Sequence, residues 1–268
     1  MVYDSLAGRP VDDAQIIYTC GIEEDEESCP VGKTANGTLL TRLPKCVGGV
    51  LSTQKAGYQT SYKQLDSDIA TGAVALQIQP LTTYNLTLKR YKIEKQNDGW
   101  TLQTLPSALS NQEEAMIVLT RKSELGEEVF SAVAYMHGDS ELDQTFGGHT
   151  DVQIIPGKYD VSITTMLRPY SPIIFQPKEI CVGPICKDMP ENDIQFNSTD
   201  ALPIGGADFE WTARPQDLQY AKTIEFYSID YDIENTDTDS LAIEDIGLAG
   251  NKEQNSKAYL SLLTPQPR

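Results

Sequence analysis

The sequence predicts a mainly β protein built from two consecutive antiparallel β-sandwich domains, with a short helical segment at the C-terminal end. Three observations predict this fold class. Most apolar stretches are short and alternate with polar residues at a period of two, as half-buried strands do. Glycine, proline and asparagine-glycine turns separate these stretches at short intervals. The 268 residues, with 40% hydrophobic content, suffice for two domains that each have a core.

The first domain is predicted over residues 1–95. A turn at Gly8 and Pro10 precedes its first strand, because glycine permits unusual φ angles and proline fixes φ. Asn36 and Gly37 predict a hairpin, since a type I′ turn needs positive φ at both central positions. The returning strand is expected to carry Leu39, Leu40 and Leu43. Further strands are expected at 50–53, 73–79 and 84–93.

The second, larger domain is predicted over residues 96–268, with a sub-boundary near residue 200. Its start is set by four turn formers in a row, Gln96 to Gly99. A capped short helix is expected from Asp239, and residues 253–263 favour helix over strand. Strands are expected at 115–120, 129–136, 154–163, 173–175, 194–196, 207–212 and 223–231.

The N-terminal third carries a spaced pattern that resembles a known family. The pattern consists of Gly8, Pro10, Val11, Ala14 and Ile16, then Thr34, Gly37 and Leu39, then Lys55, Gly57 and Tyr58. It resembles the carboxypeptidase regulatory-like domain, a transthyretin-like β-sandwich that is related in shape to PEGA surface modules. The resemblance implies a fold and no catalytic residues, since such domains are appended to enzymes, adhesins and transporters alike. Pro156, Gly157, Tyr159 and Val161 resemble a late strand of the same kind of module.

The charge of the chain disfavours whole classes of partner. The formal net charge is −18, whereas nucleic acids and anionic lipid headgroups are bound by basic surfaces. No apolar run approaches the roughly 20 residues needed to cross a bilayer. We expect a soluble, extracellular ectodomain cut from a longer protein, with any membrane anchor outside this chain.

The five cysteines favour disulfides over zinc, because no histidine lies beside them. Cys181 and Cys186 flank a Gly-Pro turn that could bring their sulfurs together. Cys20 could pair with Cys29 or with Cys46, and the two loops differ by less than about 1 kcal/mol in expected stabilisation. We prefer Cys20–Cys29, which leaves one cysteine free or paired between chains. Three N-glycosylation sequons agree with secretion, at Asn36, Asn85 and Asn197.

Two acidic regions are metal candidates. Asn235, Asp237 and Asp239 alternate as calcium ligands do, and Asp232 completes the candidate set. Ser240 stands in place of the required glycine, so a polar connection is the simpler interpretation. A second region combines two imidazoles with carboxylates, at His137, Asp139, Glu141, Asp143, His149 and Asp151. Its spacing fits no metal signature, and a solvated loop is the simpler interpretation there too.

No catalytic motif is present, so we expect no enzymatic activity. The leading hypothesis is a non-enzymatic cell-surface module for adhesion, assembly or protein–protein interaction. The alternative is a carbohydrate-binding accessory module of a larger secreted protein, in which Trp100 could stack on a sugar. Trp211 shares a strand face with Phe209 and is expected in the core.

Overall fold

The structure is a computed structural model that describes most of the chain. It describes residues 1–20, 27–67, 72–96, 99–122, 129–138, 150–169, 172–175, 178–182, 185–189, 194–197, 200–233, 236 and 243–268. The chain is mainly β, as predicted, and the sandwich architecture of its parts stays a prediction. It forms two compact units: unit 1 comprises residues 1–83, 121–130 and 153–157, and unit 2 comprises 84–120, 131–152 and 158–268.

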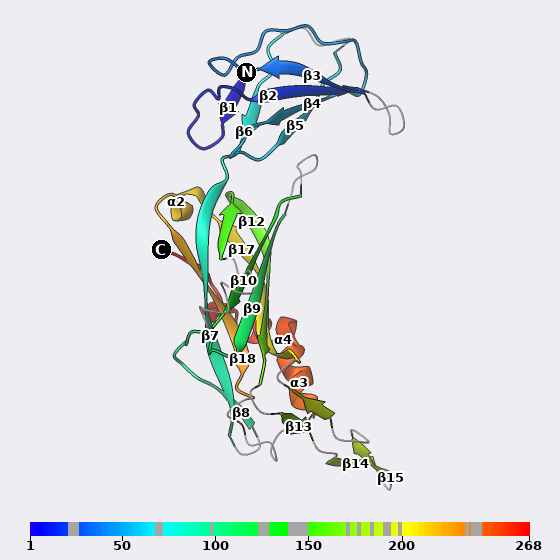
Figure 1. Cartoon of the computed structure of the whole chain (residues 1–268), viewed down its shortest axis with the longest axis vertical. Coiled ribbons are helices and arrows are strands. Elements are labelled where there is room, and N and C mark those ends of the chain that lie inside the picture. The colour runs from blue at the N-terminus through cyan, green and yellow to red at the C-terminus, as the bar shows by residue number, and fades with distance from the viewer. Residues whose placement is uncertain are drawn as a thin grey trace. The chain divides into compact units, whose positions relative to one another are not determined.

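Unit 1 contains two small sheets that share one core (Figure 1). Four strands form the larger sheet in the order β3-β2-β4-β5, and β1 pairs with β6 in parallel. Val2 and Leu76 from the small sheet and Ile16, Tyr18 and Leu51 from the larger one are buried in the same cluster. The strands are β1 (Val2–Asp4), β2 (Gln15–Cys20), β3 (Glu27–Lys33), β4 (Val50–Gln54), β5 (Ser61–Gln64) and β6 (Leu76–Ile78).

The Asn-Gly turn is confirmed, but the strand expected after it is wrong. Asn36 and Gly37 both have positive φ, and Ala35 and Thr38 bridge across them. Residues 39–46 then form no strand. Their apolar side chains stand at 39, 40 and 43, which is not the period of two that a strand with one buried face requires. Leu39 and Leu43 pack against the core of unit 1, while Leu40 is 98% exposed.

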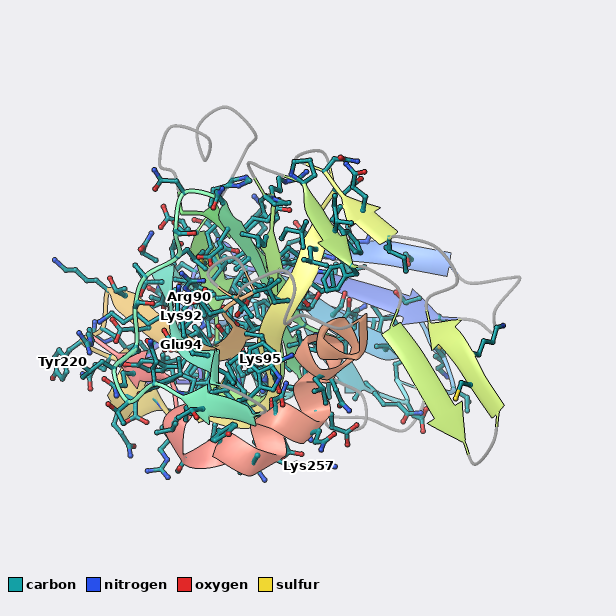
Figure 2. All side chains as sticks on the ribbon, turned by 90° about the horizontal axis from the view of Figure 1, so that it is seen from below. Arg90, Lys92, Glu94, Lys95, Tyr220 and Lys257 are labelled. Carbon is teal, nitrogen blue, oxygen red and sulfur yellow. A yellow bond between two sulfur atoms is a disulfide. The ribbon has the colours of Figure 1, made fainter. Side chains whose placement is uncertain are left out.

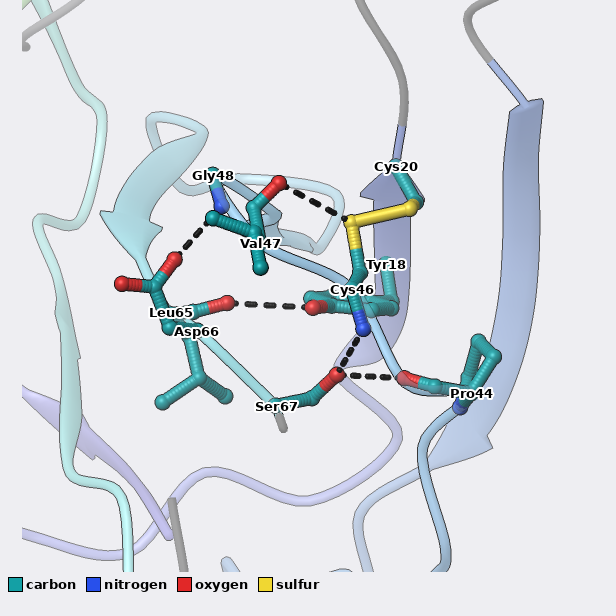
Figure 3. The surroundings of a disulfide bond; sticks show 9 residues. All are labelled: Tyr18, Cys20, Pro44, Cys46, Val47, Gly48, Leu65, Asp66 and Ser67. Atoms are coloured by element: carbon teal, nitrogen blue, oxygen red, sulfur yellow. Dashed lines mark hydrogen bonds between the residues drawn. A yellow bond between two sulfur atoms is a disulfide. The ribbon is translucent and has the colours of Figure 1, made fainter. Parts of the chain in front are cut away.

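The disulfide of unit 1 joins Cys20 to Cys46, so the preferred Cys20–Cys29 pairing is wrong (Figure 3). The strand register explains the difference. Cys29 lies opposite Tyr18, whereas Cys20 lies opposite Glu27, so the two cysteines are offset by two residues. Cys46, with a Cα–Cα distance of 6.0 Å from Cys20, lies within the span that a disulfide bridges. Cys29 is a half-buried free thiol.

Residue 46 is further fixed by hydrogen bonds (Figure 3). The Cys46 N–H donates to Ser67 Oγ at 2.8 Å, and the Ser67 hydroxyl in turn donates to the Pro44 carbonyl. Tyr18 donates from its hydroxyl to the Leu65 carbonyl at 3.0 Å. The segment after the Asn-Gly turn is therefore held at its far end by a covalent bond and a side-chain network.

Unit 2 is a large curled sheet in the order β10-β9-β12-β17-β18-β7-β11, in which β8 also pairs with β7 and β19 with β18. Two two-stranded pairs, β13-β16 and β14-β15, complete its strands. The bounds are β7 (Thr82–Gln96), β8 (Gly99–Leu102), β9 (Glu113–Arg121), β10 (Ser131–His137), β11 (Asp151–Ile154), β12 (Gly157–Leu167), β13 (Ile173–Phe175), β14 (Lys178–Val182), β15 (Ile185–Met189), β16 (Ile194–Phe196), β17 (Leu202–Ala213), β18 (Thr223–Tyr231) and β19 (Gln266–Pro267).

The sequence boundary at residues 95 and 96 falls inside this unit. The main N-terminal segment of unit 1 ends at Thr83, and Gln96 and Gly99 pair across a hairpin between β7 and β8. The turn formers thus reverse the chain inside one sheet. Near residue 200, where a sub-boundary was expected, the chain enters β17, which neighbours β12 and β18 in the same sheet.

β7 and β18 pair in parallel within the sheet of unit 2. Burial on β18 is continuous from Ile224 to Tyr231, as expected for a strand covered on both faces. Cations of β7 pair with carboxylates on and just after β18: Lys89 pairs with Glu225 at 3.2 Å, and Lys92 with Asp232 at 3.3 Å. Figure 2 shows Arg90, Lys92 and Glu94 following one another along β7.

Helices occur mainly at the C-terminal end, as the sequence predicts. They are α2 (Pro215–Leu218), α3 (Ile243–Gly250) and α4 (Lys252–Tyr259), followed by the 3₁₀ helix η2 (Leu260–Leu262). Asn251 caps α4 by accepting from the Gln254 N–H at 3.2 Å. Lys252 Nζ lies 3.0 Å from Ser162 Oγ and from Thr164 Oγ1, so α4 is tied to β12 by hydrogen bonds. None of the described helices is long and apolar enough to cross a membrane.

Candidate functional site

The described part of unit 1 contains an apolar groove with a volume of about 580 Å³. Its apolar walls come from both small sheets and from the irregular segment after the Asn-Gly turn. We call it the unit 1 groove; its main apolar side chains are Ile16, Val31, Leu39, Leu43, Val74 and Leu76. This volume lies within the range of pockets that hold small molecules or several side chains of a peptide.

Threonine hydroxyls supply the polar groups of the groove. Thr34 is buried and already engaged: its hydroxyl donates to the Val11 carbonyl at 2.7 Å and accepts from the Ala14 N–H at 3.0 Å. Thr38 and Thr41 lie at the exposed side. The described residues that line the groove include no Asp, Glu, Lys or Arg. In a chain with a net charge of −18, this lack of charged side chains favours an apolar occupant.

One wall of the groove offers backbone donors as well as side chains. The backbone N–H groups of residues 39–43 have no hydrogen-bond partner within the described part of the chain. Leu40 in the middle of this segment is 98% exposed. Unpaired backbone groups beside an apolar groove are what an added strand uses, since main-chain bonds give affinity and side-chain pockets give selectivity.

The local sequence explains why the segment stays out of the sheet. Gly32 on β3 has a φ of +148°, and a Cβ built there would lie 3.3 Å from Leu39 Cδ1. A residue without a side chain therefore lets Leu39 approach the strand from the side. Pro44 ends the segment and cannot donate to a neighbouring strand.

The predicted histidine site is only partly described. His137 is the last residue of β10, where its Nδ1 lies 3.7 Å from Glu114 Oε2 and its ring packs edge-on against Tyr135. Asp151 accepts from the Asn85 side-chain amide at 3.1 Å. Asp139, Glu141, Asp143 and His149 lie outside the described residues. No group of metal-ligating side chains is found among the residues that are described.

The predicted calcium set is also largely outside the described residues, which include Asp232 but not Asn235, Asp237 or Asp239. Asp232 is buried, and its carboxylate pairs with Lys92 on β7. The calcium site therefore stays a prediction.

Both tryptophans, Trp100 and Trp211, pack against other aromatic rings. Trp211 is buried, with Tyr159 and Phe226 against its ring, as expected of a core residue. The Trp100 ring meets the Tyr231 ring edge-on, with 4.8 Å between their centroids. Lys95 Nζ lies 5.4 Å from the centroid of the Trp100 ring. Trp100 therefore packs against other residues of unit 2.

Cys186 is disulfide-bonded, and the register of β14 and β15 places Cys181 opposite it. This agrees with the sequence expectation for the second cysteine pair. The Gly-Pro turn between them lies outside the described residues.

Two clusters of charged residues with buried carboxylates in unit 2 were not predicted from the sequence. In the first, Glu114 pairs with Arg168 at 2.9 Å and accepts from the Tyr135 hydroxyl at 2.6 Å. Burial opposes ionisation of Glu114, but these two hydrogen bonds outweigh it and lower its pKa. Burial and the neighbouring Glu114 carboxylate raise the pKa of Tyr135 to about 12. Glu114 and Arg168 thus form an ion pair, and the Tyr135 hydroxyl keeps its proton in the hydrogen bond to Glu114.

The second cluster lies where β7 and β18 pair. Arg90 and Glu113 form a buried ion pair, and Asp230 on β18 is fully buried nearby. The Thr165 and Ser228 hydroxyls face the carboxylate of Asp230 and favour its charged form. Burial raises the pKa of Asp230 to about 6, against the opposing charge of Arg90.

Strand alternation could have revealed the second cluster. Tyr84, Leu86 and Leu88 stand at every second position of β7, and Arg90 continues their buried face. Ile224 and Phe226 do the same on β18, and that face continues to Asp230.

No protein-family model matches this chain, and neither a curated protein nor a solved structure matches it. The resemblance of the N-terminal third to the carboxypeptidase regulatory-like domain therefore stays a prediction.

Proposed function

We propose that the protein is a non-enzymatic binding module whose unit 1 takes up an extended, apolar segment of a partner protein. The observation that carries this proposal is the unit 1 groove, which no charged side chain lines and which is bordered by five consecutive backbone N–H groups without a partner among the described residues. The segment would lie along residues 39–43 as an added strand and place alternate side chains in the groove. An extracellular setting, proposed from the sequence, suits such a module because disulfides persist there.

The occupant is specified by chemistry. Acidic and basic side chains would lose hydration in an apolar groove that offers them no counter-charge, so alternate positions of the segment should be aliphatic or aromatic. Proline would be excluded where the segment must donate to the carbonyl groups of 39–43.

The test is selection from a phage-displayed library of random heptapeptides, followed by calorimetric titration of the enriched peptides. We expect peptides with apolar residues at alternate positions. Leu40→Asp should weaken their binding at least about tenfold, because burying a leucine side chain is worth about 1.5–3 kcal/mol. Val47→Asp is the matched control, since Val47 is 76% exposed in the same unit and does not line the groove.

No enrichment, or enriched peptides that bind both variants equally, would contradict the proposal. Both substitutions are at exposed positions, so neither is expected to unfold the unit.

A further inference from the structure

A second hollow in unit 1, with a volume of about 310 Å³, opens between β5 and β6. The two chain segments are joined at one end, where the Gln59 N–H donates to the Gln79 carbonyl and the Leu81 N–H to the Gly57 carbonyl, each at 2.8 Å. Farther along, the Lys63 side chain reaches across: its Nζ lies 3.3 Å from the Ala75 carbonyl oxygen. The strands thus separate and leave a space between two sheet edges.

The lining of this hollow is polar and almost uncharged. Three side-chain amides and three hydroxyls dominate it, from Gln59, Gln77, Gln79, Ser5, Thr60 and Ser61. The described residues that line it include no carboxylate, and their single cation is Lys63. An amide offers donors and an acceptor together, and a hydroxyl does the same, so the surface matches a ligand whose groups both donate and accept.

Two oxygens in the lining residues are unsatisfied. Ser5 Oγ and Gln79 Oε1 are buried and have no hydrogen-bond partner in the described part of the chain. Both atoms expose almost no surface, so they lie behind the surface of the hollow and do not themselves contact a ligand in it. The remaining component is aromatic: Tyr62 lines the hollow with 43% of its surface exposed.

We propose that this hollow is a binding site for a neutral carbohydrate. The hydroxyls of a sugar ring both donate and accept, as the glutamine amides require, and its C–H face can pack against the exposed ring of Tyr62. Phosphorylated or carboxylated ligands fit less well, since Lys63 is the only cationic lining residue and the chain is strongly acidic. The volume is at the small end of ligand pockets and suits one or two sugar rings.

This site does not depend on the proposed peptide site. The unit 1 groove is apolar and bordered by residues 39–43, whereas the sugar hollow is bordered by β5 and β6. The carbohydrate alternative raised by the sequence thus involves Tyr62 in unit 1 in place of Trp100 in unit 2.

The test is an array of neutral oligosaccharides of glucose, galactose, mannose, xylose and N-acetylglucosamine, followed by calorimetry with the sugars that bind. We expect saturable binding of at least one neutral oligosaccharide, weakened at least tenfold by Tyr62→Ala and by Gln77→Ala. Both side chains are exposed, so the variants should keep the melting temperature of the parent protein.

Two controls separate this site from others. Tyr220→Ala should leave sugar binding unchanged, because Tyr220 is an 83% exposed tyrosine in unit 2 (Figure 2). Leu40→Asp, which tests the peptide groove, should also leave it unchanged. A blank array, binding confined to sulfated or carboxylated glycans, or sugar binding that survives both Tyr62→Ala and Gln77→Ala would overturn the proposal.

Discussion

Asp230 lies in an environment that disfavours its charged form. Its carboxylate is fully buried, with the Thr165 and Ser228 hydroxyls beside it, while the neighbouring Arg90 is paired with Glu113. Because burial disfavours the charged form, the folded protein holds the Asp230 proton up to about pH 6, whereas the ordinary pKa is 3.8.

Asp230→Asn should therefore change the pH dependence of stability. Between pH 3.8 and 6 the folded state binds more protons than the unfolded state, so the unfolding free energy falls as the pH rises. The full fall is on the order of 3 kcal/mol, at 1.36 kcal/mol per pKa unit. Asparagine carries no charge, so the variant should lack this fall and be more stable than the parent at pH 7.

Urea denaturation from pH 4 to pH 7 measures this difference. Asp217→Asn, at an exposed position of α2, is the control and should keep the parent slope. Parallel curves for the Asp230→Asn variant and the parent protein would contradict the assignment.

Gly205 provides a second residue-scale prediction. A Cβ at this position would lie 2.2 Å from the Ile229 carbonyl oxygen and 2.6 Å from Asp230 Oδ1. Gly205→Ala should therefore destabilise unit 2 by about 1–3 kcal/mol, because β17 must move away from β18. Gly247→Ala is the matched control: nothing lies within 4 Å of its Cβ position in α3, and alanine should stabilise the helix by up to about 1 kcal/mol. Equal effects of the two substitutions in thermal denaturation would refute this explanation.

At the scale of elements, strand alternation and turn chemistry predicted the β class and several individual elements. The Asn-Gly turn, the β18 strand and the helical C-terminal end follow from local sequence. The irregular path of segment 39–46 did not follow from local sequence. Leu39 packs beside Gly32 on β3, and Cys46 is bonded to Cys20, 26 residues away, and local sequence patterns reveal neither contact. The unit 1 groove is a consequence of that segment, so it could not be predicted from the sequence alone.

The Cys20–Cys46 disulfide should be the covalent anchor of this segment. Its loop spans 26 residues, for which removal is expected to cost about 3–4 kcal/mol. We expect the double variant Cys20→Ser, Cys46→Ser to lose this stability in guanidinium denaturation and to bind groove peptides more weakly. Cys29→Ser, which removes the free thiol, should match the parent protein in both measurements. A double variant with unchanged stability would show that the segment is held by its side chains alone.

At the scale of the whole molecule, acidity and cysteine chemistry agree with the proposed extracellular setting. The net charge of −18 keeps the protein soluble and disfavours polyanionic partners, while the two proposed binding sites are nearly free of charge. Carboxylate side chains, which are abundant in the rest of the chain, are thus missing from the described lining of both sites.

Thiol labelling of the intact protein tests the disulfide arrangement. Protein made in an oxidising compartment should take up one alkylating label under denaturing, non-reducing conditions, at Cys29. After reduction it should take up five labels, one for each cysteine. Five labels before reduction would remove the main support for an extracellular setting, and peptide mapping would identify any other pairing.

The central claim is that a peptide adds as a strand along residues 39–43. Amide hydrogen exchange, followed by NMR with and without the tightest-binding selected heptapeptide, tests it most directly. We predict that exchange of the backbone N–H groups along residues 39–43 slows on binding, at alternate positions as in a strand edge. Unchanged exchange along 39–43, with protection elsewhere or none, would contradict the account.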